Sequence, residues 1–160
     1  MADIIPSRPR GVISQRRTFA IVAGQYNAEF VTGLVLHTKR ELLAISAGFN
    51  IVAYEVPGAF EIPLAVSEVA ARGGIDAIIA LGVIIEGETA HAALIGQAVT
   101  ASLQQLALST RVPVIHEVLL VKNAEQARVR CLGEEINRGT EAARVAVRMT
   151  QVLGEIRSAR

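Results

Sequence analysis

Residues 76–85, DAIIALGVII, form an almost unbroken apolar run, and the polar stretch EGETAH (86–91) follows it directly. An apolar run of this length without alternation is typical of a strand that is covered on both faces, as in a parallel sheet. The run is far shorter than the roughly 20 apolar residues that span a bilayer. We therefore expect a buried strand with a polar turn at its carboxyl end.

On both sides of this run, strand-length apolar segments alternate with longer segments of helical period. The predicted strands are residues 18–24, 50–56, 76–85 and 112–121, and the predicted helices are residues 27–48, 59–74, 90–108, 123–136 and 140–156. Asn27 is placed to cap the first helix, and the second ends in Gly73 and Gly74, as helices commonly do. The order βαβαβαβαα predicts a parallel sheet with helices on both faces.

The composition bounds the class of protein. The 160 residues, 51% of them apolar, suit one domain, which we expect over residues 18–160 behind a flexible N-terminal arm of residues 1–17. The formal net charge of +1 gives no field that favours nucleic acid or a membrane surface. The N-terminal arm lacks the sustained apolar segment of a secretory signal. The lone Cys131 excludes an intrachain disulfide and favours a reducing, cytoplasmic location.

The high apolar content also bears on assembly. Only 4% of the residues are aromatic, so the apolar character comes mainly from aliphatic side chains. One domain of this size can hardly hide so much apolar surface. We therefore expect burial between identical subunits.

In an open parallel sheet, ligands bind beyond the carboxyl ends of the strands. Four segments lie there: GQYN (24–27), VPGAFE (56–61), EGETAH (86–91) and HEVLLVKN (116–123). The chain has neither G-x-G-x-x-G after a strand nor G-x-x-x-x-G-K-[ST], so dinucleotide and P-loop sites are not supported. It also lacks the hydroxyl-rich first turn of a flavodoxin and the acidic cluster of a phosphoacceptor domain.

The motifs at these strand ends resemble one enzyme family. They are YN (26–27), VPGAFEIP (56–63), ALGVIIEGETAH (80–91), PVI (113–115), EQAxxR (125–130) and NRGTEAA (137–143). Their order along residues 18–155 resembles that of the 6,7-dimethyl-8-ribityllumazine synthase family. The resemblance implies an α/β fold, a flavodoxin-like three-layer αβα sandwich with a four-stranded parallel sheet.

The resemblance also implies a reaction of riboflavin biosynthesis. 5-Amino-6-ribitylaminouracil condenses with 3,4-dihydroxy-2-butanone 4-phosphate, giving the lumazine with loss of water and phosphate. His91 is the expected proton-transfer residue, because an imidazole titrates near neutral pH. No cofactor and no metal are implied. The expected pyrimidine and ribityl contacts are Tyr26, Asn27, Gly58, Ala59, Glu61, Val83, Ile84, His116 and Arg138, and the expected phosphate contacts are Gly87, Glu88, Thr89 and Arg130.

Several residues depart from the family's pattern. Glu86 stands where many members have arginine, Ala93 where they commonly have aspartate, and Arg138 where many have lysine. Glu88 adds a carboxylate within the expected phosphate turn. His116 matches a frequent phenylalanine, and its imidazole either stacks on the heterocycle or points along the strand. The departures keep two alternatives open: a catalytically weak or inactive oligomeric shell or scaffold, and a flavin- or lumazine-binding module.

The resemblance further implies pentamers, with or without assembly of twelve into a hollow icosahedral shell of sixty subunits. Each active site then lies between neighbours. Tyr26, Glu61 and His91 come from one subunit, and His116, Arg130 and Arg138 come from the next. Riboflavin synthase is a further candidate partner.

Overall fold

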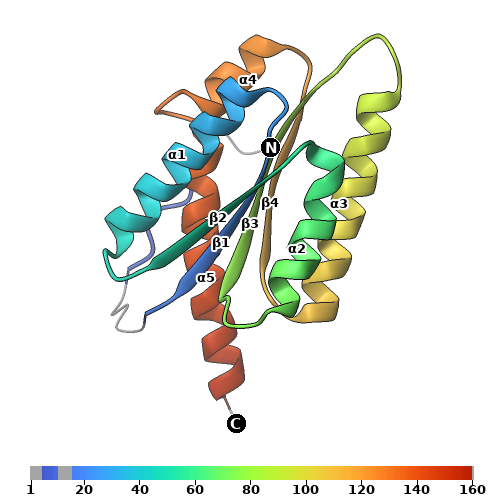
Figure 1. Ribbon diagram of the computed structural model, residues 1–160. Helices are drawn as coiled ribbons and strands as arrows, with labels where there is room; N and C mark the ends of the chain where they lie inside the picture. The colour runs from blue at the N-terminus through green and yellow to red at the C-terminus, as the bar shows by residue number, and fades with distance from the viewer. Residues whose placement is uncertain (1–4, 11–15, 160) are drawn as a thin grey trace.

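The computed structural model describes residues 5–10 and 16–159. The fold has three layers, with one sheet between two layers of helices (Figure 1). The sheet is parallel, with the order β2 (Asn50–Val56), β1 (Thr18–Gly24), β3 (Ala77–Ile85), β4 (Val114–Val121). One face is covered by α1 (Ala28–Ile45), α4 (Ala124–Cys131) and α5 (Arg138–Ser158), and the other by α2 (Ile62–Ala71) and α3 (His91–Thr110). The predicted flavodoxin-like α/β fold is confirmed.

The apolar run of residues 76–85 forms the third strand, as predicted. Residues 77–83 of β3 are buried, and their side chains alternate between two cores. Ile79 and Leu81 lie in the core under α1 and α5, whereas Ile78 and Ala80 lie in the core under α2 and α3. Because both faces are covered, each successive position needs an apolar side chain, and polar alternation disappears.

Several predicted boundaries differ from the observed ones, for local reasons. The fourth strand begins at Val114 rather than at residue 112, after Pro113, which has no backbone N–H to donate. The last helix begins at Arg138 rather than at residue 140, because the side chain of Asn137 accepts a hydrogen bond from the backbone N–H of Thr140. The first helix ends at Ile45, the short fourth helix ends at Cys131, and the second opens with a 3₁₀ turn, η1 (Ala59–Glu61).

The prediction that the side chain of Asn27 caps the first helix was wrong. Asn27 precedes α1 in the left-handed conformation (φ 57°, ψ 45°), and its side chain makes no capping hydrogen bond. Instead, its amide Nδ2 donates to the carbonyl oxygen of Val83 over 2.8 Å. Asparagine tolerates left-handed geometry better than most residues. The side chain therefore ties the β1–α1 turn to the carboxyl end of β3.

The N-terminal arm expected over residues 1–17 falls partly outside the described residues, which omit 1–4 and 11–15. Residues 6–10 lie against α1 and α5, where Arg8 donates two hydrogen bonds of 2.9 Å to Glu41. Arg144 donates to the carbonyl oxygen of Pro6 over 2.7 Å. Among the helices described, none has the length and apolar content to cross a membrane.

Helices α1 and α5 approach closely at Gly139. A Cβ atom there would overlap the backbone carbonyl oxygen of Leu34 and lie 3.1 Å from Cβ of His37. The hydroxyl of Thr38 donates to the Gly139 carbonyl oxygen over 3.0 Å at the same contact. Gly154 lies on the same helix, but a Cβ atom there would meet nothing within 4 Å.

We predict that Gly139→Ala destabilises the fold and that Gly154→Ala does not. The methyl group at 139 must displace backbone, which costs about 1–3 kcal/mol or more. At the exposed position 154, alanine favours the helix by about 0.5–1 kcal/mol. Urea unfolding of both variants measures the difference, and equal stabilities would contradict the proposed close contact.

Candidate active site

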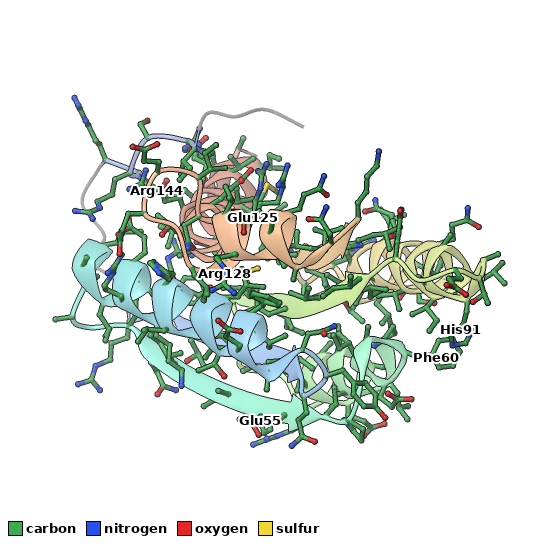
Figure 2. The ribbon with its side chains drawn as sticks, turned by 90° about the horizontal axis from the view of Figure 1, so that it is seen from above. Glu55, Phe60, His91, Glu125, Arg128 and Arg144 are labelled. Atoms are coloured by element: carbon green, nitrogen blue, oxygen red, sulfur yellow. The ribbon has the colours of Figure 1, made fainter. Side chains whose placement is uncertain are left out.

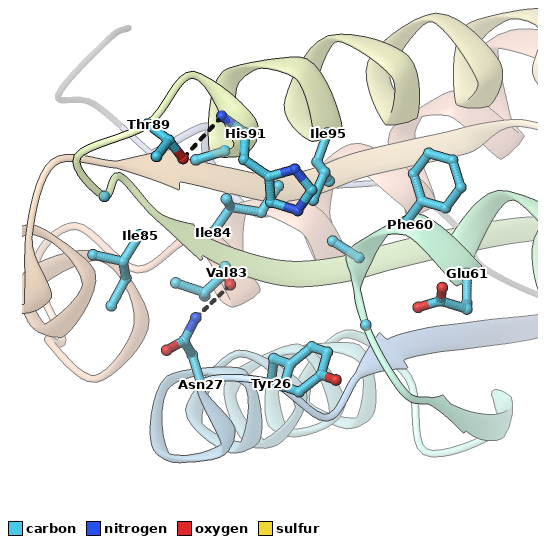
Figure 3. Close-up of a pocket in the computed structure, with 14 residues that line it drawn as sticks. Tyr26, Asn27, Phe60, Glu61, Val83, Ile84, Ile85, Thr89, His91 and Ile95 are labelled. Atoms are coloured by element: carbon cyan, nitrogen blue, oxygen red, sulfur yellow. Dashed lines mark hydrogen bonds between the residues drawn. The ribbon is translucent and has the colours of Figure 1, made fainter.

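A pocket of about 590 Å³ opens at the carboxyl ends of β1 and β3, beside the loop that follows β2 (Figure 3). Its walls come from three segments that are distant in sequence, residues 26–27, 58–61 and 83–95. The lining residues are Tyr26, Asn27, Gly58, Ala59, Phe60, Glu61, Val83, Ile84, Ile85, Gly87, Thr89, His91, Ala92 and Ile95. Ten of these were predicted, so the structure brings together most of the expected site.

One wall combines an aromatic ring, a glycine and a carboxylate. A Cβ atom on Gly58 would lie 2.9 Å from the Tyr26 ring and 2.9 Å from Oε2 of Glu61. Glycine at this position therefore lets the ring and the carboxylate approach the same backbone segment. The Tyr26 side chain is 71% exposed, so its face is free for contact with a ligand.

The prediction missed Phe60, Ile85, Ala92 and Ile95, which add apolar wall. Phe60 lies within η1 and is 62% exposed at the rim of the pocket. An aromatic side chain inside the quoted VPGAFEIP motif was a usable signal for it. Ile95 follows His91 by four residues on α3, and this spacing puts both on one helix face.

The opposite wall is the turn between β3 and α3. Gly87, Thr89 and His91 line the pocket, and His91 is the first residue of α3. The His91 backbone N–H points to the Thr89 hydroxyl oxygen over 3.5 Å. Free backbone N–H groups at the start of a 20-residue helix favour an anion. Glu88 belongs to this turn but does not line the pocket.

His116 was predicted at the substrate but does not line this pocket. It lies on β4 and faces α3, where its Nε2 is 2.8 Å from the Thr100 hydroxyl oxygen. That hydroxyl donates to the Gly96 carbonyl oxygen, and the Val118 backbone N–H donates to His116 Nδ1. These partners require a neutral imidazole that carries its proton on Nε2. Burial lowers the His116 pKa from its ordinary value, which favours the same state.

The two predicted arginines also lie outside the pocket of their own chain. Arg130 is half-buried on α4 and donates to the carbonyl oxygen of Gln126 over 3.3 Å. Arg138 is 3% exposed and forms an ion pair with Glu141. No arginine or lysine is among the described residues that line the pocket. The described residues also contain no group of three or more His, Cys, Asp or Glu side chains that could hold a metal.

The fold and this pocket define an α/β protein with a ligand site at the carboxyl edge of a parallel sheet. The sequence profile of the family described as 6,7-dimethyl-8-ribityllumazine synthase matches residues 16–154. The chain belongs to this family. The predicted class, a transferase of riboflavin biosynthesis, is thereby confirmed.

Individual relatives agree with this assignment. The 6,7-dimethyl-8-ribityllumazine synthase of Paracidovorax citrulli is 38% identical over 85% of this chain and 86% of its own length. Proteins of the same name from Burkholderia multivorans and Pediococcus pentosaceus are 39% and 36% identical, over 82% and 83% of this chain and 75% and 86% of their own lengths. The identities are moderate, and they extend over nearly the whole described fold.

Glu117 lies next to His116 in sequence but faces α5 on the other side of the sheet. Burial and the nearby Glu141 carboxylate raise its pKa to about 8, although Arg138 opposes the shift. The Glu117 carboxyl is therefore largely protonated in the folded protein at neutral pH. In the unfolded chain it would ionise near its ordinary value of 4.5.

A pH-dependent stability follows from this difference. Because the folded state binds the Glu117 proton more tightly, the free energy of unfolding should fall as pH rises from about 4.5 to about 8. We predict that Glu117→Gln, which is neutral at every pH, reduces that fall by an amount on the order of a few kcal/mol. Urea unfolding at pH 5 and pH 8 measures it. The exposed Glu135→Gln serves as the control, and an unchanged pH slope in Glu117→Gln would contradict the prediction.

Proposed function

We propose that this chain condenses 5-amino-6-ribitylaminouracil with 3,4-dihydroxy-2-butanone 4-phosphate in the pocket of Figure 3. The products are 6,7-dimethyl-8-ribityllumazine, water and inorganic phosphate. The observation that most supports this is a shared pocket in which Tyr26 and Glu61 lie on one side and His91 with its helix start on the other (Figure 3). The planar substrate, its polyol and the phosphate each need one of these features.

The pyrimidine and its ribityl chain fit the wall formed by Tyr26 and η1. A planar ring gains contact on the face of Tyr26 and on the apolar side chains of Val83 and Ile84. The Glu61 carboxylate can accept hydrogen bonds from ribityl hydroxyls, because it offers two oxygens and several lone pairs. The backbone of Gly58 and Ala59 offers further polar groups beside it.

The phosphate of the second substrate fits the turn before α3. Backbone N–H groups of the Gly87–Thr89 turn and the positive end of α3 favour a dianion there, and the Thr89 hydroxyl adds a donor. The Glu86 and Glu88 carboxylates, which depart from the family's pattern, are exposed and lie outside the pocket lining. Their position reduces their repulsion of a bound phosphate.

His91 then lies between the two substrates. Its imidazole can take a proton from the attacking amine, return one as water leaves, and assist the departure of phosphate. Among the described residues, none hydrogen-bonds to the His91 side chain. The aspartate that the family commonly carries two residues later is replaced by Ala93. The imidazole is therefore oriented by the helix start and by the substrates rather than by a carboxylate.

We predict that His91→Ala lowers turnover by about 10²–10⁴-fold, which is the usual loss when a positioned acid/base is removed. A steady-state assay that follows lumazine absorbance with both substrates measures it. Gln104→Ala, an exposed polar residue on the same helix and outside the pocket, is the control.

Unchanged turnover in His91→Ala would remove the histidine from the mechanism and leave proximity and phosphate binding as the catalytic effects. Absence of turnover in the wild-type chain would instead favour the shell or scaffold. Binding of riboflavin or a lumazine without turnover would favour the binding module.

We further propose that the active site is shared between subunits of a cytoplasmic homopentamer, which can itself build a sixty-subunit shell. Among the described residues that line the pocket of one chain there is no arginine, although the proposed substrate carries a phosphate dianion. Arg130 is the best-placed cation for delivery from a neighbour, together with His116 and Arg138. The exposed apolar side chains of Phe60, Leu64 and Leu94 supply surface for such an interface.

Subunit mixing tests the sharing. We predict that His91→Ala and Arg130→Ala are each nearly inactive, and that an equal mixture dissociated and reassembled together recovers about a quarter of wild-type activity. In random rings, one site in four combines an intact His91 with an intact Arg130 from its neighbour. Sites built within one chain would recover nothing on mixing, and each variant reassembled alone provides the control.

A further inference from the structure

A second cavity, of about 560 Å³, lies between the N-terminal segment 6–10 and α5. Arg144, on its wall, and His91, in the active-site pocket, lie at opposite ends of the molecule (Figure 2). The described residues that line the two cavities do not overlap. The volume falls within the range of about 300–1,000 Å³ that is usual for small-molecule sites.

Four arginines line this cavity: Arg8 and Arg10 from the N-terminal segment, and Arg144 and Arg148 from α5. Two carboxylates pair with them. Glu41 binds both Arg8 and Arg144, and Glu155 lies 3.4 Å from Arg148 in an exposed pair. The four arginines and the two carboxylates therefore give this cavity a local charge of about +2, although the formal net charge of the whole chain is only +1.

Glu41 makes the arrangement rigid. Its side chain is only 8% exposed, and it accepts hydrogen bonds from Arg8 (2.9 Å) and from Arg144 (2.7 Å). The two guanidinium groups lower the Glu41 pKa, which keeps this carboxylate ionised. The second contact of Arg144, to the carbonyl oxygen of Pro6, fixes the segment over the helix. The contacts of Arg8 and Arg144 thus hold the N-terminal segment against α1 and α5.

Arg10 and Arg148 are the cations that remain available. Arg10 is exposed and forms no ion pair with any of the residues that the structure describes. The side chain of Arg148 is 57% exposed, and its long exposed pair with Glu155 contributes little. Guanidinium groups bind phosphate oxygens through charge-assisted, often bidentate hydrogen bonds.

The rest of the wall is largely apolar. Val145 and Met149 lie on α5, and the rings of Pro6 and Pro9 face them from the N-terminal segment. A wall of this kind suits the carbon skeleton of an organic ligand. Inorganic phosphate alone would leave it uncovered.

We propose that this cavity is a binding site for a small organic phosphate, separate from the active site. Arg10 and Arg148 hold the phosphate dianion, whose charge matches the local excess, and the apolar body of the ligand lies on Val145 and Met149. The cavity walls favour such a molecule over a nucleic-acid backbone, which needs an open basic surface. The site does not depend on the reaction proposed above.

1-Naphthyl phosphate is a suitable probe, because it joins an apolar fluorescent ring to a phosphate. Binding to the oligomeric wild-type protein is measured by fluorescence titration, with 1-naphthol as the uncharged comparison. We expect the phosphate to bind more tightly than the naphthol and its affinity to fall with added salt. Arg10→Ala combined with Arg148→Ala should weaken binding by about tenfold or more.

Two control variants separate this cavity from other sites. Arg157→Ala removes an arginine from the same helix outside the cavity, and Arg130→Ala removes the proposed active-site phosphate contact. Arg157→Ala should bind the probe like wild type, and Arg130→Ala should retain the binding that depends on Arg10 and Arg148. Thermal unfolding without probe should be unchanged in the double variant, because Arg10 and Arg148 are exposed. Failure of the probe to bind at millimolar concentration, equal binding by the double variant, or loss of binding in Arg130→Ala would each overturn the proposal.

Discussion

The burial of β3 on both faces is the constraint on which the rest of the structure depends. Ile78 and Ile79 are both fully buried, although they point to opposite sides of the sheet. This is possible only if helices cover both faces, and parallel connections through helices provide that cover. All four strands then end at one edge, where the segments that follow β1, β2 and β3 form one pocket.

The same strand also sets the geometry of that pocket. Asn27 donates to the carbonyl oxygen of Val83, so the turn that carries Tyr26 is attached to the carboxyl end of β3. The helix α3 begins at His91, six residues after β3 ends at Ile85. The strand β3 thus positions both the turn that carries Tyr26 and the helix start that carries His91. A site built in this way keeps its dimensions before a ligand arrives.

Most of the fold could be predicted because its signals are local. Uninterrupted apolar runs and helical periodicity located every strand and helix, while the ends were misjudged where a single group decides them, such as the Asn137 side chain at the start of α5. Asn27 was misjudged because a nearby helix start favoured capping, whereas its partner, Val83, lies 56 residues away. The helix-capping propensity of a residue cannot reveal a contact between residues so far apart in sequence. Its place in the VPGAFEIP motif made Phe60 a candidate, but only the structure shows that its side chain lies at the rim of the pocket.

The two arginines expected from a neighbouring subunit differ in what their use would cost. Arg130 makes one long hydrogen bond to Gln126 and is half-buried, so turning toward a phosphate sacrifices little. Arg138 is almost fully buried and is bound to Glu141, close to Glu117. Withdrawing it would leave an uncompensated carboxylate in a poorly solvated place, which is far more costly than losing an exposed pair. Arg130 is therefore the stronger candidate for the proposed phosphate contact, and Arg138 is the more costly of the two to redirect.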